Sequence, residues 1–262
     1  MSATAATTLA PEDIPSLEGK VSAEEWQARV DLAACYRLVD LYGMSDLTGT
    51  HISARLPDDE DAFLINPYGL YFDEITASSL IKVDLDGNVK SESSYPVNAA
   101  GYTIHSAVHA VRHDVNCALH THTRAGMAVS ALKDGLMPIT QHSARFIGNI
   151  GYHDYEGIAT NLDERERLQR DLGDNCALIL RNHGLMTCGV TTPHAFRLVE
   201  KLEKACQAQL DGLAAGTKPT EITQTVQENT TKHFAKNEAI RAQSDWVALL
   251  RQLDRIDPSY KH

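Results

Sequence analysis

Apolar and polar positions divide the chain into an irregular start, a long alternating middle and a polar helical end. Residues 1–21 show no hydrophobic period and are predicted to form a flexible N-terminal tail. From Ser22, a capping-box sequence precedes apolar residues at helical spacing, which predicts a helix that ends near Tyr42. The folded part of the chain is therefore expected to begin at Ser22.

The middle of the chain alternates between short apolar runs and longer helical stripes. Short runs bounded by turn residues predict strands, and stripes with a period of three to four residues predict helices. The predicted strands are 47–56, 62–66, 80–85, 115–119 and 176–180, and the predicted helices are 99–111, 163–172 and 193–214. This alternation indicates an α/β domain, residues 22–215, in which helices cover a sheet.

Two further helical stretches, 220–235 and 238–253, follow a linker that contains glycine and proline. The second stretch has a narrow apolar face that includes Trp246 and Leu250, which suits packing onto the domain or onto a neighbouring subunit. We therefore expect residues 216–262 to form a C-terminal helical extension.

The charge balance and the cysteines narrow the classes of function. With 24 Lys and Arg against 35 Asp and Glu, the net charge of −11 argues against a surface that neutralises nucleic-acid phosphates. Five widely spaced cysteines indicate reduced, buried thiols rather than a disulfide framework. The first residues do not resemble a secretory signal, and no run approaches the roughly 20 apolar residues that span a bilayer. We expect a cytoplasmic protein with no nucleic-acid or membrane partner.

Histidines mark a candidate metal site. His120 and His122 follow the predicted strand 115–119, and residues two apart in a strand point to the same face, so both imidazoles can converge on one ion. His183 follows the predicted strand 176–180 and precedes a glycine. Three imidazoles that leave positions open for water or substrate are typical of a catalytic metal site.

A second histidine pair, His105 and His109, falls on one face of the predicted helix 99–111. It lacks the glutamate of the His-Glu-x-x-His motif of metalloproteases, so it does not indicate a protease. Packing under the sheet with hydrogen-bonded ring nitrogens is the favoured interpretation, and metal ligation is the alternative.

Six ordered blocks give the chain a family resemblance. Their most specific parts are His-Thr-His at 120–122 and Asn-His-Gly at 182–184. The blocks are residues 47–55, 64–69, 74–79, 120–123, 152–157 and 181–184. Together they resemble the class II aldolase/adducin family, and the sequence is most similar to its adducin-like bacterial branch.

The resemblance implies a three-layer α/β/α fold around a mixed, largely antiparallel sheet, assembled as a homotetramer with sites at subunit boundaries. It also implies that His120, His122 and His183 bind a divalent metal, with Zn2+ expected and Mn2+ or Fe2+ as alternatives. In the aldolases of this family, such a metal stabilises the negative charge that develops as a carbon–carbon bond breaks.

The sequence departs from the pattern of sugar-phosphate aldolases at a helix start. The carboxylate that those enzymes carry four residues before the helical histidine is replaced by Gly101, and Ala99 and Ala100 stand where phosphate-binding serines are expected. We therefore expect a lyase, either a retro-aldolase or a decarboxylase, that acts on a small oxygenated or carboxylic acid without phosphate.

The resemblance also nominates residues around the metal. His142 lies near the position of a catalytic tyrosine and is the candidate proton donor, and Arg145 is the candidate partner of a substrate carboxylate. His51, Ser53 and Gly69 fall in blocks that the family uses to bind substrate.

Two other functions are compatible with the same histidines. The family includes non-enzymatic adducin head domains, so the chain is alternatively a binding or scaffold module with a residual metal site. A second alternative is an iron-dependent oxygenase, because three imidazoles with open positions also suit ferrous iron.

Overall fold

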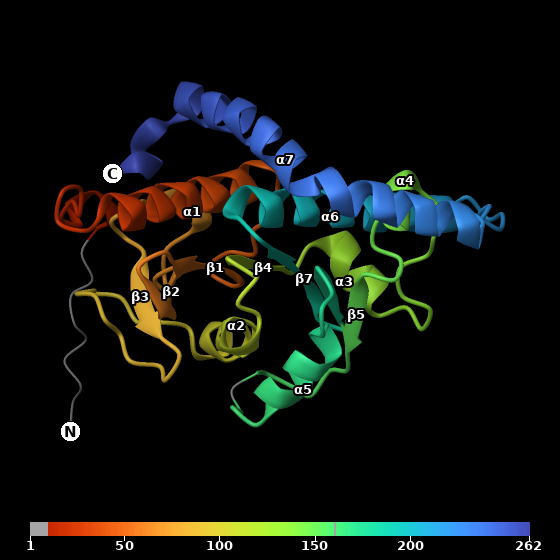
Figure 1. Cartoon of the computed structure of the whole chain (residues 1–262), viewed down its shortest axis with the longest axis horizontal. Coiled ribbons are helices and arrows are strands. Elements are labelled where there is room, and N and C mark those ends of the chain that lie inside the picture. Colours follow the sequence, from red (N-terminus) through yellow and green to blue (C-terminus); the bar gives the residue numbers. More distant parts are fainter. Residues whose placement is uncertain (1–9, 160) are drawn as a thin grey trace.

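A computed structural model describes residues 10–159 and 161–262 of the protein. The described residues form a seven-stranded sheet in which all neighbours are antiparallel except β5 and β6 (Figure 1). Across the sheet the strands are β3 (Ile81–Asp84), β2 (Asp59–Ile65), β1 (His51–Leu56), β4 (Cys117–Thr121), β7 (Gly184–Gly189), β6 (Ala177–Leu180) and β5 (Ile150–His153).

Helices cover both faces of this sheet. The helices α1 and α6 pack on one face, and α2 and α5 lie on the other (Figure 1). The α-helices are α1 (Ala23–Leu41), α2 (Ala99–Val111), α3 (Arg124–Ser130), α4 (Gln141–Ala144), α5 (Glu164–Leu172), α6 (Thr192–Ala214) and α7 (Gln224–Ile256). Three short 3-10 helices are Pro11–Asp13, Phe72–Glu74 and Pro258–Lys261. The predicted three-layer α/β/α architecture with a mixed, largely antiparallel sheet is confirmed.

The central strands β1 and β4 have one apolar face and one polar face. Ile52 and Leu119, which are neighbours in the register, belong to the core that packs against α1. His51 and His120 are also neighbours and point to the opposite face, where α2 lies. Because alternate residues of a strand share a face, this register gathers histidines under α2.

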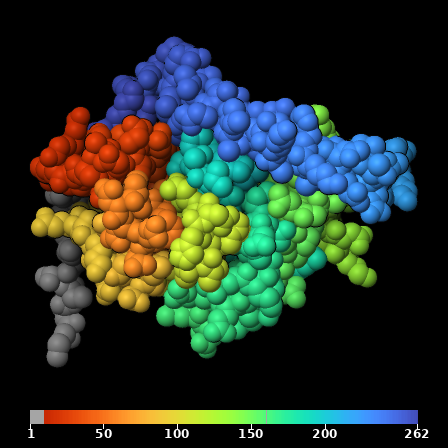
Figure 2. All heavy atoms as spheres, in the orientation of Figure 1, coloured from red at the N-terminus to blue at the C-terminus, as the bar shows by residue number. Residues whose placement is uncertain are grey.

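The C-terminal extension is one helix rather than two. No glycine or proline interrupts residues 224–256, so helix α7 is continuous. Figure 2 shows the blue C-terminal segment lying against the red α1 and the cyan α6. Trp246 and Leu253 are buried in the core shared with α1, as the apolar face of this segment predicts. None of the helices in the described part of the chain is long and apolar enough to cross a membrane.

The N-terminal segment also differs in part from its prediction. Residues 1–9 lie outside the described residues, but residues 10–21 pack against the body instead of extending from it. Ile14 contacts the core, and the Leu17 amide donates to Ser78 Oγ at 3.1 Å. The predicted cap of the first helix is present, since the Ser22 side chain accepts from the Glu25 amide. All five cysteines are free.

Candidate metal centre

Three histidines meet where β4 ends beside the turn between β6 and β7. His120 is in β4, His122 follows that strand, and His183 is in the turn. One ring nitrogen from each lies within 4.8 Å of the others, and Nε2 of His120 is 2.9 Å from Nε2 of His122. The structure therefore brings together the three residues that the spacing nominated.

The β6–β7 turn presents His183 by means of two unusual backbone positions. Asn182 adopts a left-handed conformation with φ 56°, which asparagine tolerates better than most residues. At Gly184, a Cβ atom would lie 2.3 Å from the carbonyl oxygen of Thr121, so only glycine allows the turn to approach β4 this closely. The conformation of Asn182 and the missing side chain of Gly184 thus place His183 next to β4.

Hydrogen bonds fix the orientation of two rings. His120 Nδ1 donates to the Leu185 carbonyl at 2.9 Å, and His122 Nδ1 donates to Asp46 Oδ2 at 2.9 Å. In both rings the unshared pair therefore stays on Nε2, the atom that faces the other histidine. A partner on the outer nitrogen is characteristic of metal-binding imidazoles. Asp46 is a candidate site residue that the sequence did not reveal, because nothing in its local context marks it as the partner of His122.

The environment also keeps two of the rings neutral. Burial, followed by the neighbouring His122, lowers the pKa of His183 to about 4. Burial is also the main cause that holds the pKa of His120 well below its ordinary value. Imidazoles whose ring nitrogens converge in this way fit a divalent cation, and three ligands leave positions open for a substrate.

A fourth histidine fills the space in front of Gly101. His51 packs on His120 with ring centroids 5.2 Å apart and an interplanar angle of 29°. A Cβ atom at Gly101 would lie only 2.6 Å from Cδ2 of His51. An imidazole from β1 therefore occupies the space that a side chain at position 101 would need. A carboxylate at position 101 and the present position of His51 exclude each other. Sequence reasoning missed this pairing, because the two residues are far apart in the chain.

The pair on α2 packs under the sheet with hydrogen-bonded rings, as the favoured interpretation predicted, although Nδ1 of His109 has no partner among the described residues. His105 and His109 are fully buried, and both bond to Ser53 Oγ, at 2.5 and 2.7 Å. His105 also bonds to Nδ1 of His51 at 2.9 Å. Neither residue belongs to the group of converging metal donors.

The other nominated residues lie apart from the triad within one chain. Arg145 is bound to Glu238 of α7 at 2.6 Å and lies over the ring of Phe234. His142 is half-buried in α4, where burial and then Arg145 lower its pKa. Gly69 is exposed in the turn after β2, with φ 113°. Their roles toward a substrate remain predictions.

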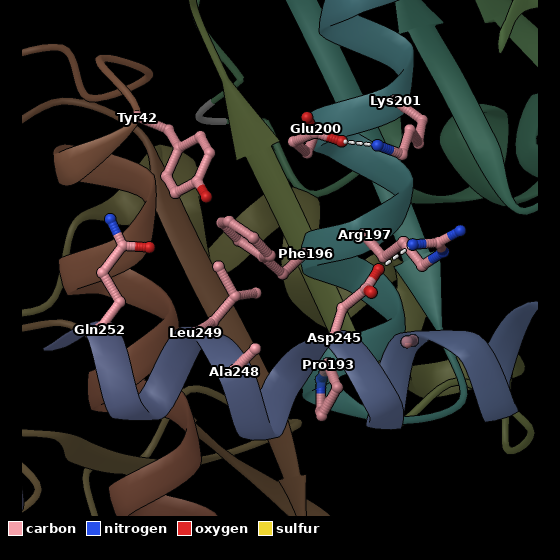
Figure 3. Close-up of a pocket in the computed structure, with 11 residues that line it drawn as sticks. Tyr42, Pro193, Phe196, Arg197, Glu200, Lys201, Asp245, Ala248, Leu249 and Gln252 are labelled. Carbon is pink, nitrogen blue, oxygen red and sulfur yellow. Dashed lines mark hydrogen bonds and ion pairs between the residues drawn. The ribbon is translucent and has the colours of Figure 1, made fainter. Parts of the chain in front are cut away.

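Two pockets are candidate positions for a ligand. A narrow one adjoins the triad and is lined by His183, Tyr155, His153 and Arg181. A larger hollow of about 310 Å³ lies between α1, α6 and α7 (Figure 3). Its walls are apolar side chains such as Phe196 and the ion pairs Glu200–Lys201 and Arg197–Asp245, and it shares no residue with the triad.

The fold and the site together define a class: an α/β protein in which one region of a mixed sheet carries three converging histidines that fit a metal ion. The family is equally clear, because residues 30–210 match the model described as the Class II Aldolase and Adducin N-terminal domain. The chain belongs to this family, a superfamily of metal-dependent lyases with the adducins as relatives.

Individual relatives support the assignment along nearly the whole chain. A protein of Pseudomonas aeruginosa named "Putative aldolase class 2 protein" is 50% identical over 255 residues, 96% of this chain and 97% of that protein. The crystal structure of an aldolase II superfamily protein from Pseudomonas syringae is 48% identical, with a TM-score of 0.90, and the match covers 95% of this chain and 100% of that one. The L-fuculose 1-phosphate aldolase from Glaciozyma antarctica is 30% identical, with a TM-score of 0.81 and coverage of 92% and 94%.

Proposed function

We propose that the protein is a divalent-metal-dependent carbon–carbon lyase that cleaves or decarboxylates a small non-phosphorylated oxygenated or carboxylic acid. The observation that carries this proposal is the triad of His120, His122 and His183, with two rings oriented by outer hydrogen bonds. Metal-binding imidazoles usually donate their outer N–H to a carboxylate or a carbonyl, as His122 and His120 do here.

The three histidines would hold the ion, for which we propose zinc, with manganese or ferrous iron as alternatives. When bound, the cation supplies electrophilic stabilisation of an oxygen that gains negative charge as the carbon–carbon bond breaks. The chain's own contribution is to hold His120 and His183 neutral by burial and to orient His120 and His122 through their outer hydrogen bonds.

The start of α2 supports a substrate without phosphate. Helix N-termini bind phosphate through free backbone amides. Here the Asn98 side chain accepts hydrogen bonds from the amides of Ala100 and Gly101, and Ala99 and Ala100 offer no hydroxyl. This helix start therefore has less to offer a phosphate than a helix start with serines and free amides.

The surroundings of the triad support assembly into an oligomer, for which we propose a homotetramer. Leu47, next to the aspartate that holds His122, is an apolar residue with 72% of its surface exposed. A neighbouring subunit that covered it would also shield the metal centre from water. We further propose that the protein works in the cytoplasm, where its five free thiols stay reduced.

We propose that His142 transfers a proton and that Arg145 binds a substrate carboxylate. The Arg145 guanidinium is paired with Glu238, so a substrate carboxylate would have to compete with that carboxylate. His142 has a buried Nδ1 without a partner in the described part of the chain and is the better candidate for proton transfer.

The substitution His183→Ala tests the metal assignment. Metal content of the purified protein is expected to fall from about one equivalent per chain to less than about a tenth, because two imidazoles hold zinc far more weakly than three. His233→Ala is the matched control, since His233 is an exposed histidine of α7, and it should leave the metal content unchanged. Elemental analysis and circular dichroism measure metal and fold.

Activity is then tested on hydroxy acids and aromatic carboxylic acids with the metal-loaded protein. Cleavage or release of carbon dioxide that is lost in His183→Ala supports the lyase. A protein without metal or turnover would instead be a scaffold module of the adducin type. Bound iron with substrate-dependent consumption of oxygen would establish the oxygenase alternative.

A further inference from the structure

Four buried side chains form one hydrogen-bonded chain that leads from the metal centre into the protein. Nδ1 of His51 lies 2.9 Å from Nε2 of His105, whose Nδ1 is 2.5 Å from Ser53 Oγ. Ser53 Oγ is in turn 2.7 Å from Nε2 of His109. His51 is 4% exposed and the other three are fully buried. All four side chains of this hydrogen-bonded chain are thus buried.

The two rings on α2 each carry a single proton. Burial lowers the pKa of both His105 and His109 to about 3. A neutral imidazole donates from one nitrogen and accepts at the other. The proton on any one ring therefore determines where every other proton in the chain lies.

His109, at the inner end of the hydrogen-bonded chain, determines in which direction the hydrogen bonds are donated. Nδ1 of His109 is buried and has no hydrogen-bond partner among the described residues, and the ring stacks on Phe63 with centroids 5.0 Å apart. A buried N–H group without an acceptor is rarer and more costly than a buried acceptor without a donor. His109 therefore carries its proton on Nε2, the nitrogen that faces Ser53.

From that end, each donor has one acceptor. His109 Nε2 donates to Ser53, the Ser53 hydroxyl donates to Nδ1 of His105, and Nε2 of His105 donates to Nδ1 of His51. The remaining proton of His51 is then on Nε2, which has no hydrogen-bond partner among the described residues of the protein. The ring that bears it packs on His120 of the triad.

We propose that this chain fixes His51 as a hydrogen-bond donor at the metal centre, where its Nε2–H binds a carbonyl or carboxylate oxygen of the substrate. An Nε2–H has no free pair for a cation, so His51 stays outside the ligand set and leaves an open position on the metal. His105, Ser53 and His109 act through His51 as positioning residues. The substrate part of this inference rests on the proposed function.

The tautomers of the wild-type protein test the chain directly. Nitrogen-15 NMR of the full-length, metal-free protein with labelled histidine distinguishes protonated Nε2 from protonated Nδ1. The expected result is protonated Nε2 in His51, His105 and His109. Protonated Nδ1 in His109 or His51 would overturn the proposal, and this measurement needs no variant.

Two serine variants test the coupling. Ser53→Ala removes the hydroxyl that donates to Nδ1 of His105, so the preference of His51 for a protonated Nε2 should weaken while the triad remains. Ser106→Ala is the control, because Ser106 is a buried serine of α2 that bonds to the Thr103 carbonyl and not to the chain. An unchanged His51 tautomer in Ser53→Ala would refute the coupling.

Oxalate, a carboxylate probe, tests the donor function in zinc-loaded protein. Loss of an ordered donor should weaken oxalate binding about five- to tenfold in Ser53→Ala and not in Ser106→Ala, measured by calorimetry. Equal affinities would overturn the donor role. If none of zinc, manganese and ferrous iron binds, the proposed function fails together with the donor role of His51 toward the substrate. The tautomers of the metal-free protein still decide whether the hydrogen bonds run in the direction we infer.

Discussion

Gly101 shapes the metal centre by lacking a side chain. It lies on α2 opposite β1, and the His51 ring occupies the volume that any side chain at this position would need. Glycine in a helix costs roughly 1 kcal/mol relative to alanine, so the helix itself gains nothing from it. The reason for glycine at this position is the imidazole that packs against it.

The substitution Gly101→Ala is expected to destabilise the protein by about 1–3 kcal/mol, because the new methyl group overlaps the His51 ring and must displace it. Gly212→Ala is the matched control in α6, where a Cβ atom would meet nothing closer than 3.8 Å. The control should be neutral or stabilising by up to about 1 kcal/mol, as helix propensity predicts. Urea denaturation measures both. A stabilised Gly101→Ala protein would show that His51 does not occupy this space.

Helix α7 is tied to the domain by a buried charge as well as by apolar contacts. Glu238 is 4% exposed and pairs with Arg145 at 2.6 Å and with Arg197 at 2.8 Å. Charges removed from water are tolerated only while they stay paired. The position of α7 thus depends on the buried carboxylate of Glu238. The polar sequence of this helix gave no reason to expect a buried glutamate.

Glu238→Ala is expected to destabilise the protein by about 3–5 kcal/mol, since it leaves a buried guanidinium without its counter-charge. Glu228→Ala, an exposed position on the same helix, should change the free energy of unfolding by less than about 0.5 kcal/mol. Chemical denaturation followed by circular dichroism compares the two. Similar small effects would mean that α7 is held by its apolar face alone.

At the scale of the whole molecule, buried neutral histidines make the free energy of unfolding depend on pH. The pKa of His105 and of His109 is about 3 in the folded protein, below the ordinary value of 6.5, mainly because of burial. Between these values the unfolded chain binds more protons than the folded one, so the free energy of unfolding falls as the pH falls. Above pH 6.5 the two groups are neutral in both states and contribute no slope.

The metal-free protein is therefore expected to lose about 1 kcal/mol per pH unit from each of these two histidines as the pH falls from 6 to 4. His109→Gln should remove the share that belongs to His109, so its slope is shallower than that of the wild type. Urea midpoints at several pH values measure the slopes. Parallel slopes would contradict the assignment to His109.

Local patterns predicted much of the fold and the convergence of three histidines. The period of apolar residues marked α1, α2 and α6, and two apolar runs that are each followed by a histidine of the triad marked β4 and β6. The strands β5 and β7 were missed. β7 begins and ends in glycine and has few β-branched residues, so its strand conformation comes from pairing with β4 and β6 rather than from its own propensity.

The sequence by itself determined which imidazoles can converge, because alternation along a strand and the position of a turn are local properties. Only the tertiary structure decided that Asp46 orients His122, that His51 fills the space at Gly101, and that a serine links two rings of α2 to a third on β1. These contacts join segments far apart in the chain and depend on the register of β1 with β4. A shift of one residue in that register would turn His51 to the opposite face of the sheet.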